Sequence, residues 1–153
     1  MERDEFSRRV RAMTDRLYRI AYGQLREPQD RMDAVQNALL KAWSARHRLR
    51  EPAYFETWLI RILINECHNL QRRRPFVPLD ALPDRAAPAS DSREDVRDAI
   101  LRLPEKQRLC IILHYMEGYK TAEVARILRV PEETVRSRLK RARAALKIQL
   151  DEM

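Results

Sequence analysis

Hydrophobic residues recur along most of the chain every three to four positions, which is the spacing of one face of an α-helix. The first such stretch extends from Phe6 to about Leu25, and the second from about Pro28 to Ala45. A third follows a break at residues 50–52 and continues to about residue 74. The pattern therefore predicts three amphipathic helices in the first half of the chain, each with one face toward a shared core.

The second predicted helix has distinct buried and exposed faces. Its expected buried stripe consists of Met32, Val35, Ala38, Leu39, Ala42 and Trp43. The residues off that stripe are Asp33, Gln36, Asn37, Leu40 and Lys41. A polar outer face is ordinary for a surface helix, but a leucine within it indicates a surface that binds a partner.

The third predicted helix has a wide apolar face and an opposite face rich in amides and arginines. The polar face carries Arg61, Asn65, His68, Asn69, Arg72 and Arg73. Tyr54, Phe55 and Trp58 lie close to its start. Such side chains hold unstacked bases and backbone phosphates, whereas aromatic residues at helical spacing also commonly belong to a core. The pattern alone leaves both interpretations open.

Residues 75–95 contain four prolines and no helical period, so we interpret them as an extended linker. A helical pattern returns from Val96 to Leu103, and a further helix is expected from Pro104 to a C-terminal glycine at Gly118. The sequence thus predicts an all-α protein with two small helical domains, residues 1–74 and 96–153, joined by a flexible acidic linker.

The stretch Gly118–Lys147 predicts two short helices separated by a tight turn. Thr121 is expected to cap the first helix, and the second is expected to begin near Pro131, because proline is accepted at a helix start but not in its interior. Arg129 occupies the turn position where glycine is common. The turn is therefore expected to form without a residue that favours a positive φ.

The second of these helices is apolar every three to four residues and basic elsewhere. Its basic residues are Arg136, Arg138, Lys140, Arg141, Arg143 and Lys147. Two helices at this spacing form a helix-turn-helix, which places the second helix in the DNA major groove. The alternative is an amphipathic helix whose basic face is merely solvated.

Composition narrows the class of protein. The 153-residue chain has a net charge of +8, made up of +6 in residues 1–74, −3 in the linker and +5 in residues 96–153. Two basic domains indicate a polyanionic partner, and the helix-turn-helix favours DNA over a membrane surface. The charged amino terminus lacks the apolar core of a secretory signal, and no apolar run approaches a membrane span, so a cytoplasmic protein without membrane insertion is expected.

Catalytic and metal chemistry are not indicated by the sequence. The two cysteines, Cys67 and Cys110, lie in helical patterns without CxxC spacing and are expected to be small buried hydrophobes. His47, His68 and His114 are isolated along the chain, and no phosphate-binding loop is present. We therefore expect no metal, no cofactor and no enzymatic activity.

Three segments in order carry a family resemblance. They are "DAVQNALLKAW", "YFETWLIRILINECHNLQRRR" and "LPEKQRLCIILHYMEGYKTAEVARILRVPEETVRSRLKRARAAL". Over nearly the whole chain this order resembles the extracytoplasmic-function (ECF) group of bacterial RNA polymerase sigma factors. The resemblance implies that residues 1–74 correspond to sigma region two and residues 96–153 to region four, with residues 75–95 threading the RNA path of the polymerase.

The resemblance also implies roles for individual residues. Those expected to dock on the clamp helices of core RNA polymerase are Asp33, Gln36, Asn37, Leu40 and Lys41. Those expected at the single-stranded minus-ten element are Tyr54, Arg61, Asn65, Asn69 and Arg72, with residues 51–54 placed to take a flipped base. Those expected at the duplex minus-thirty-five element are Arg136, Ser137, Lys140, Arg141 and Arg143. Asn37 replaces a commoner acidic residue of the docking helix.

The implied function is transcription initiation at promoters chosen by this chain, with core RNA polymerase and promoter DNA as partners. An anti-sigma factor, soluble or membrane-bound, is implied as a further partner. The alternative from another class is a stand-alone helix-turn-helix regulator that uses residues 1–74 to dimerise or to sense a ligand. That alternative requires a palindromic operator and a symmetric dimer.

Overall fold

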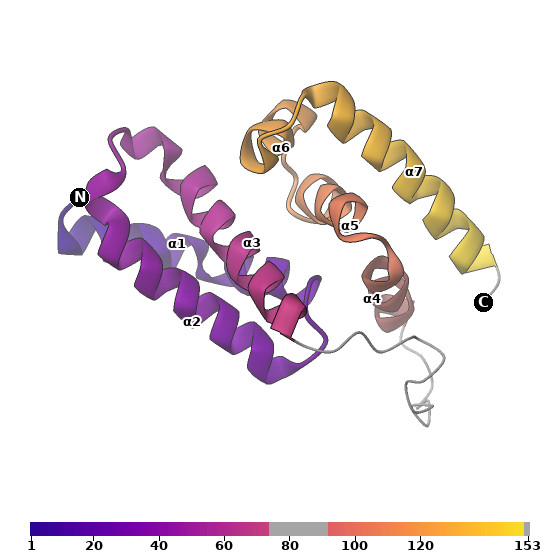
Figure 1. The fold of residues 1–153 in the computed structure, drawn as a ribbon, viewed down its shortest axis with the longest axis horizontal. Helices are drawn as coiled ribbons and strands as arrows, with labels where there is room; N and C mark the ends of the chain where they lie inside the picture. The colour runs from indigo at the N-terminus through magenta and orange to yellow at the C-terminus, as the bar shows by residue number, and fades with distance from the viewer. Residues whose placement is uncertain (74–91, 152–153) are drawn as a thin grey trace.

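The computed structural model describes residues 1–73 and 92–151, and in these ranges all regular structure is helical (Figure 1). The first half contains α1 (Arg3–Tyr22), α2 (Pro28–Ala45), the short 3₁₀ turns η1 (Arg46–Arg48) and η2 (Pro52–Tyr54), and α3 (Phe55–Arg73). The second half contains α4 (Ser92–Arg102), α5 (Glu105–Ile111), the π-helical turn η4 (Ile112–Met116), α6 (Thr121–Leu128) and α7 (Glu132–Asp151). The prediction of an all-α protein with two small domains is confirmed.

The first domain is a three-helix unit in which α2 packs against both α1 and α3. One end is closed by an aromatic cluster, because the ring of Phe6 meets that of Trp43 at 5.3 Å and that of Phe55 at 5.9 Å between centroids. The expected core positions of α1 are buried, among them Leu17 and Ile20 at 0% exposure. The aromatic residues near the start of α3 are therefore shared between this core and the surface.

The predicted buried face of α2 is wrong at Met32. Met32 is 45% exposed, whereas Ala34, Val35, Ala38 and Ala42 are fully buried. The buried face is thus rotated about the helix axis toward Ala34. Alanines at these positions let α1 and α3 approach the backbone of α2 closely, and the larger methionine is left outside.

The second domain wraps α4, α5 and α6 around the inner face of α7. Helix α4 begins at Ser92, four residues before the expected start at Val96. Of the extended linker predicted over residues 75–95, residues 75–91 lie outside the described residues and the last four residues belong to α4, so the predicted linker is wrong at that end. After the π-helical turn, Gly118 adopts φ 79°, a left-handed conformation that reverses the chain into α6 as expected for a terminal glycine.

The turn of the helix-turn-helix is left-handed at a residue that does not favour that conformation. Arg129 adopts φ 57° and ψ 47°, and the backbone N–H of Val130 donates to the Ala125 carbonyl at 3.0 Å. The turn thus forms without a residue that favours a positive φ, as expected, and Arg129 itself adopts the left-handed conformation. The capping hydrogen bonds at the end of α6 hold Arg129 in a region that costs an L-residue about 1–2 kcal/mol.

Replacing Arg129 by glycine is accordingly expected to stabilise the protein by about 0.5–1 kcal/mol, because the relief of left-handed strain exceeds the extra flexibility of glycine in the unfolded chain. The measurement is the midpoint of urea unfolding at unchanged slope. Arg129→Ala removes the same charge but keeps the strain. If the alanine variant gains as much stability as the glycine variant, the gain comes from charge and not from the backbone.

The two domains lie against each other, with α3 beside α6 (Figure 1). Their buried apolar residues belong to one continuous cluster. In the described ranges, the helices are too short or too polar for any of them to cross a membrane. The packing between domains brings the predicted DNA-contacting face of α3 next to the helix-turn-helix.

Candidate nucleic-acid interface

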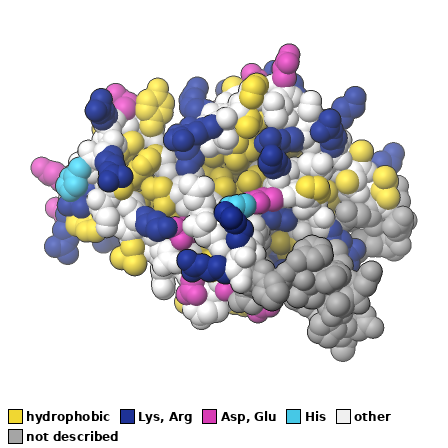
Figure 2. Space-filling model, in the orientation of Figure 1, with side chains coloured by type: hydrophobic (Ala, Val, Ile, Leu, Met, Phe, Trp, Pro, Cys, Tyr) yellow, Lys and Arg dark blue, Asp and Glu magenta, His cyan; other side chains and the backbone are white. Residues whose placement is uncertain are grey.

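Helix α7 presents a basic surface on the side that faces away from its core contacts. Val135, Leu139 and Ala142 pack inward with at most 2% exposure. All five residues predicted at the upstream duplex element are exposed: Arg136, Ser137, Lys140, Arg141 and Arg143. The space-filling view shows basic side chains distributed over much of the visible face of the molecule (Figure 2).

Arg136, near the start of α7, and Arg143, further along the helix, have different hydrogen-bond partners. Arg136 Nη2 pairs with Glu132 Oε1 at 2.8 Å, one turn earlier on the same exposed surface. Arg143 Nη1 instead donates to the Tyr115 hydroxyl at 2.9 Å. Arg143 follows Glu132 by about 16 Å along the helix axis, at a rise of 1.5 Å per residue. Arg143 is thus about three turns beyond the start of α7 and is already hydrogen-bonded within the chain.

Thr121 does not act as the predicted N-cap. The cap position is Lys120, whose backbone N–H donates to Glu123 Oε1 at 3.1 Å. Thr121 is the first residue of α6, and its hydroxyl donates to Glu132 Oε1 at 2.7 Å. This contact joins the start of α6 to the start of α7.

Asn65 and Asn69, predicted to read unstacked bases, are exposed and line one cleft of about 480 Å³ between α2 and α3. The indole of Trp58 lies in the same cleft, as does Arg48 from η1. Amides, an aromatic ring and a guanidinium are the groups that hydrogen-bond base edges, stack on bases and pair with phosphates. Arg48 was missed in the sequence because it lies outside the α3 pattern.

The other residues predicted at the single-stranded element are spread along α3. Tyr54 is 52% exposed at the end of η2, and Arg72 is exposed in the last turn of α3. Arg61 is turned away from the cleft and toward the second domain. Its Nε donates to the Ile127 carbonyl at 3.0 Å, and its Nη2 donates to the Arg126 carbonyl. Burial lowers the pKa of Arg61, and the nearby Arg129 lowers it further.

The predicted docking face of α2 is largely open. Gln36 and Asn37 are exposed, and Leu40 is 66% exposed. Asp33 is half-buried and accepts a hydrogen bond from Gln29 Nε2 at 2.9 Å. Leu40 is thus an exposed apolar side chain among polar groups on α2.

Lys41 has a structural contact that the sequence did not reveal. Its side chain is 60% exposed, yet Nζ pairs with Oε1 of Glu66, whose side chain is only 7% exposed. Glu66 lies in the otherwise apolar face of α3. The ammonium of Lys41 therefore compensates a carboxylate that would otherwise be buried without a charged partner.

Lys41→Glu is expected to destabilise the first domain, because it places a second carboxylate beside the buried Glu66. The expected loss is about 3 kcal/mol or more, as for a buried charge left without its partner. The measurement is urea unfolding followed by circular dichroism. Gln36→Glu adds a negative charge on the exposed face of the same helix and is expected to change stability by less than about 0.5 kcal/mol. Equal stability of both variants would contradict the structural role of Lys41.

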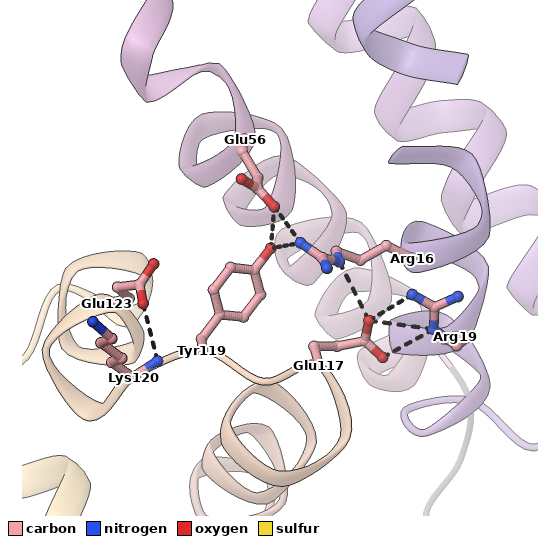
Figure 3. Close-up of polar contacts among 7 residues, drawn as sticks. All are labelled: Arg16, Arg19, Glu56, Glu117, Tyr119, Lys120 and Glu123. Atoms are coloured by element: carbon pink, nitrogen blue, oxygen red, sulfur yellow. Dashed lines mark hydrogen bonds and ion pairs between the residues drawn. The ribbon is translucent and has the colours of Figure 1, made fainter. Parts of the chain in front are cut away.

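A polar cluster joins the two domains and was not predicted (Figure 3). Glu117, after the π-helical turn, has a side chain 1% exposed, and it accepts hydrogen bonds from Arg19 Nη2 at 2.9 Å and Arg19 Nε at 3.2 Å. Arg16 Nε lies 3.4 Å from the same carboxylate. Both arginines come from α1, so the acidic group of one domain is held by basic groups of the other.

Arg16 also connects to Tyr119 and Glu56. Its Nη1 donates to the Tyr119 hydroxyl at 2.7 Å, and the same nitrogen pairs with Glu56 Oε1. The Tyr119 hydroxyl donates to Glu56. Burial first, and then the Glu56 carboxylate, raise the pKa of Tyr119 well above its ordinary value. The phenol therefore remains a hydrogen-bond donor throughout the physiological pH range.

His68 and the two cysteines contribute to the folded structure. His68 is not isolated, because Nδ1 lies 3.0 Å from both carboxylate oxygens of Glu105 in the second domain. Cys67 and Cys110 are buried, as predicted, and burial raises the pKa of Cys67 to about 12. Within residues 1–73 and 92–151, the acidic, histidine and cysteine side chains form no group suited to a metal ion.

Comparison with known proteins accounts for both halves. The family model "Sigma-70 region 2" matches residues 9–75, and "Sigma-70, region 4" matches residues 93–146. The ECF RNA polymerase sigma factor SigM of Mycobacterium tuberculosis is 38% identical over 151 residues, covering 95% of this chain and 76% of SigM. SigW of Bacillus subtilis is 27% identical over 172 residues, covering 99% of this chain and 92% of SigW.

Solved structures show the same architecture. The sigma factor RpoE of Bartonella quintana, in complex with the anti-sigma factor NepR, matches with a TM-score of 0.80 and 25% identity over 96% of this chain and 97% of RpoE. CnrH, in complex with the cytosolic domain of CnrY, matches with a TM-score of 0.78 and 27% identity over 99% of this chain and 90% of CnrH.

The fold and the two candidate surfaces define a two-domain, all-helical DNA-binding protein of the transcription apparatus. More closely, the chain belongs to the ECF group of RNA polymerase sigma factors. The family predicted from the three sequence segments is confirmed. The comparisons favour a sigma factor over the stand-alone helix-turn-helix regulator.

Proposed function

We propose that this protein binds core RNA polymerase in the cytoplasm and directs it to promoters, with DNA reading divided between its two domains. In this proposal the chain supplies specificity to the polymerase and no catalysis of its own. Residues 1–74 dock on the polymerase and hold the minus-ten element as single-stranded DNA. Residues 96–153 read the minus-thirty-five element as duplex, and residues 75–95 connect them.

One observation carries the proposal. A cleft lined by Asn65, Asn69 and Trp58 lies in one domain, and an exposed basic helix of a helix-turn-helix lies in the other. The first suits unstacked bases, and the second suits the major groove of a duplex. A stand-alone repressor needs only the second, whereas a protein that opens promoters needs both.

Docking is assigned to the exposed face of α2. Gln36, Asn37 and Leu40 form its open part, and Asp33 and Lys41 border it with their side chains already in contact with Gln29 and Glu66. We assign the main apolar contact to Leu40, because burying a side chain that is 66% exposed gains free energy from a surface now in water.

An anti-sigma factor is a further proposed partner. Two solved sigma factors that resemble this chain over nearly its whole length, RpoE and CnrH, are in complexes with NepR and with the cytosolic domain of CnrY. The proposed partner is therefore a protein that binds this chain as NepR binds RpoE, in a complex of the two proteins. Whether it is soluble or anchored in a membrane does not change the surface that this chain offers.

Run-off transcription tests the proposal. Purified core polymerase, incubated with this chain and a library of genomic fragments, is expected to give discrete transcripts that are absent with core polymerase alone. The same chain incubated with the fragments without polymerase is expected to protect no palindromic site. A footprint on a palindrome by a dimer of this chain, without discrete transcripts, would support the stand-alone regulator instead.

A further inference from the structure

We propose that Glu132, anchored by Thr121, is a positioning residue that holds the guanidinium of Arg136 in one orientation toward a guanine edge of the upstream duplex. Glu132 acts through Arg136 and sets how strongly the second domain prefers one base pair over another. That Arg136 meets DNA rests on the proposed function. The hydrogen bonds that orient Arg136 are contacts within this chain.

The carboxylate of Glu132 connects the two helices of the helix-turn-helix. Its Oε1 accepts a hydrogen bond from the Thr121 hydroxyl at 2.7 Å and another from Arg136 Nη2 at 2.8 Å. Thr121 is the first residue of α6, whereas Glu132 and Arg136 lie one turn apart at the start of α7. One oxygen atom therefore links the start of α6 to a basic side chain of α7.

The hydrogen bond from Thr121 distinguishes this pair from an ordinary surface ion pair. The side chains of Arg136 and Glu132 are 62% and 38% exposed. An exposed pair of this kind adds little to stability, because water screens the charges and both side chains lose rotamer freedom. Thr121 restricts the Glu132 side chain from a second helix, so the carboxylate presents a defined acceptor to Arg136.

The hydrogen bond to Glu132 leaves Arg136 able to bind a base edge. Each of the two terminal nitrogens of a guanidinium carries two N–H groups. With one N–H of Nη2 donated to Glu132, the other N–H of Nη2 and one of Nη1 can form a planar fork. Such a fork matches O6 and N7 of guanine in the major groove. A guanidinium held in one orientation therefore favours this edge over contacts that need no alignment.

Glu132 has opposite effects on specificity and on overall affinity. A long side chain that must be ordered on binding lowers affinity by about two- to tenfold, and one that is already ordered escapes most of this loss. The negative charge of a carboxylate is repelled by every phosphate, whatever the sequence. Glu132 is thus expected to weaken binding to all duplexes and to widen the difference between the correct and the incorrect ones.

Affinity of the holoenzyme for upstream duplexes tests the positioning role. The probes carry the minus-thirty-five element of a promoter found by run-off transcription, either intact or with one base pair exchanged. Arg136→Ala first locates the base pair at which the preference is lost. Glu132→Ala is then expected to reduce the preference at that same base pair by about two- to tenfold. It is also expected to strengthen binding to the exchanged duplex.

Glu133→Ala is the matched control for charge. Glu133 is exposed at the next position of α7 and takes part in neither hydrogen bond of Glu132. Its replacement is expected to strengthen binding to all duplexes alike and to leave the preference unchanged. An unchanged preference with Glu132→Ala, or an equal loss with Glu133→Ala, would overturn the positioning role.

A double-variant cycle shows whether Glu132 acts through Arg136. In a chain that already carries Arg136→Ala, adding Glu132→Ala is expected to leave the remaining preferences unchanged, because the side chain that Glu132 orients is gone. A further loss of preference in the double variant would show that Glu132 acts independently of Arg136 and would contradict the proposal.

Two substitutions of Thr121 test the anchor. Thr121→Val keeps the branched shape and removes the hydroxyl, whereas Thr121→Ser keeps the hydroxyl. The valine variant is expected to lose preference at the base pair that Arg136 reads, and the serine variant is expected to retain it. Circular dichroism and urea unfolding verify that both variants fold. Equal preferences in the two variants would show that the Thr121 hydroxyl does not anchor Glu132.

The same measurements separate this inference from the proposed function. If the holoenzyme binds all upstream duplexes alike, the second domain does not read the minus-thirty-five element, and both are overturned. If Arg136→Ala weakens every duplex equally, Arg136 contacts a phosphate and only the positioning role is overturned. The positioning role alone is also overturned if Arg136→Ala loses the preference at one base pair while Glu132→Ala keeps it.

Discussion

Leu40→Asp is expected to weaken the binding of this chain to core RNA polymerase by about thirtyfold or more. Leu40 is the most exposed large apolar side chain of α2, at 66% in the free chain, and Met32 of the same helix is 45% exposed. A central apolar contact of this kind contributes about 2 kcal/mol or more to an interface, and a buried carboxylate adds a desolvation cost. The substitution leaves the core of the domain untouched, because Leu40 does not belong to it.

Competition for core polymerase against a fluorescent copy of the unmodified chain measures this loss. Val96→Asp is a matched control, because Val96 is an aliphatic residue 42% exposed on a helix of the other domain. Thermal unfolding is expected to be the same for both variants. If Leu40→Asp competes as well as the unmodified chain, the polymerase does not dock on this face of α2.

Arg136→Ala is expected to cost about 1–3 kcal/mol at one base pair of the upstream element and to relax the preference there, if its guanidinium reads a guanine edge. Arg136 and Arg141 lie about 7.5 Å apart along α7, within reach of neighbouring base pairs. The readout is the affinity of the holoenzyme for a set of upstream duplexes that differ at single positions. A phosphate contact would instead weaken all of them alike and lower the salt slope by about one.

Asn65→Ala is expected to leave that upstream binding unchanged and to reduce strand opening, because Asn65 lines a cleft of the other domain. Permanganate reactivity near the start site reports the opening. Lys106 is exposed on α5, and Lys106→Ala is the control for Arg136→Ala, because it also removes a positive charge from the second domain. Normal strand opening with Asn65→Ala, together with loss of opening with Arg136→Ala on a pre-melted template, would contradict this assignment. It would show that the second domain acts in strand opening and the first does not.

Local periodicity predicted most of the fold. The bounds of α2, Pro28–Ala45, follow from a proline at the start and a regular apolar stripe, and the helix-turn-helix follows from two adjacent stripes. The rotation of α2 toward Ala34 was not predicted, because alanine carries little hydrophobic signal although it permits close helix packing. The left-handed Arg129 was missed because its conformation is imposed by the hydrogen bonds at the end of α6.

Polar contacts between residues that are far apart in the sequence could not be predicted from hydrophobic periodicity. Lys41 was recognised as a surface residue, but its partner Glu66 belongs to another helix and interrupts an apolar face. Glu117 and Tyr119 lie on either side of Gly118 in a loop without a periodic pattern. Arg16 and Arg19 lie about a hundred residues earlier, among many other arginines. The roles of the residues predicted for DNA contact came from the family resemblance and stay predictions.

The pairing of Glu117 with Arg16 and Arg19 has a consequence for chimeric proteins. Exchanging the promoter-reading half of this chain for that of a relative preserves each domain as a folded unit but separates a carboxylate from the two guanidinium groups of α1 that neutralise it. A second domain transferred from this chain to a relative therefore needs arginines on the first helix of that relative. Hybrids that contain Glu117 together with the two arginines keep this carboxylate paired. Hybrids that contain Glu117 without the arginines have a buried charge with no counterion.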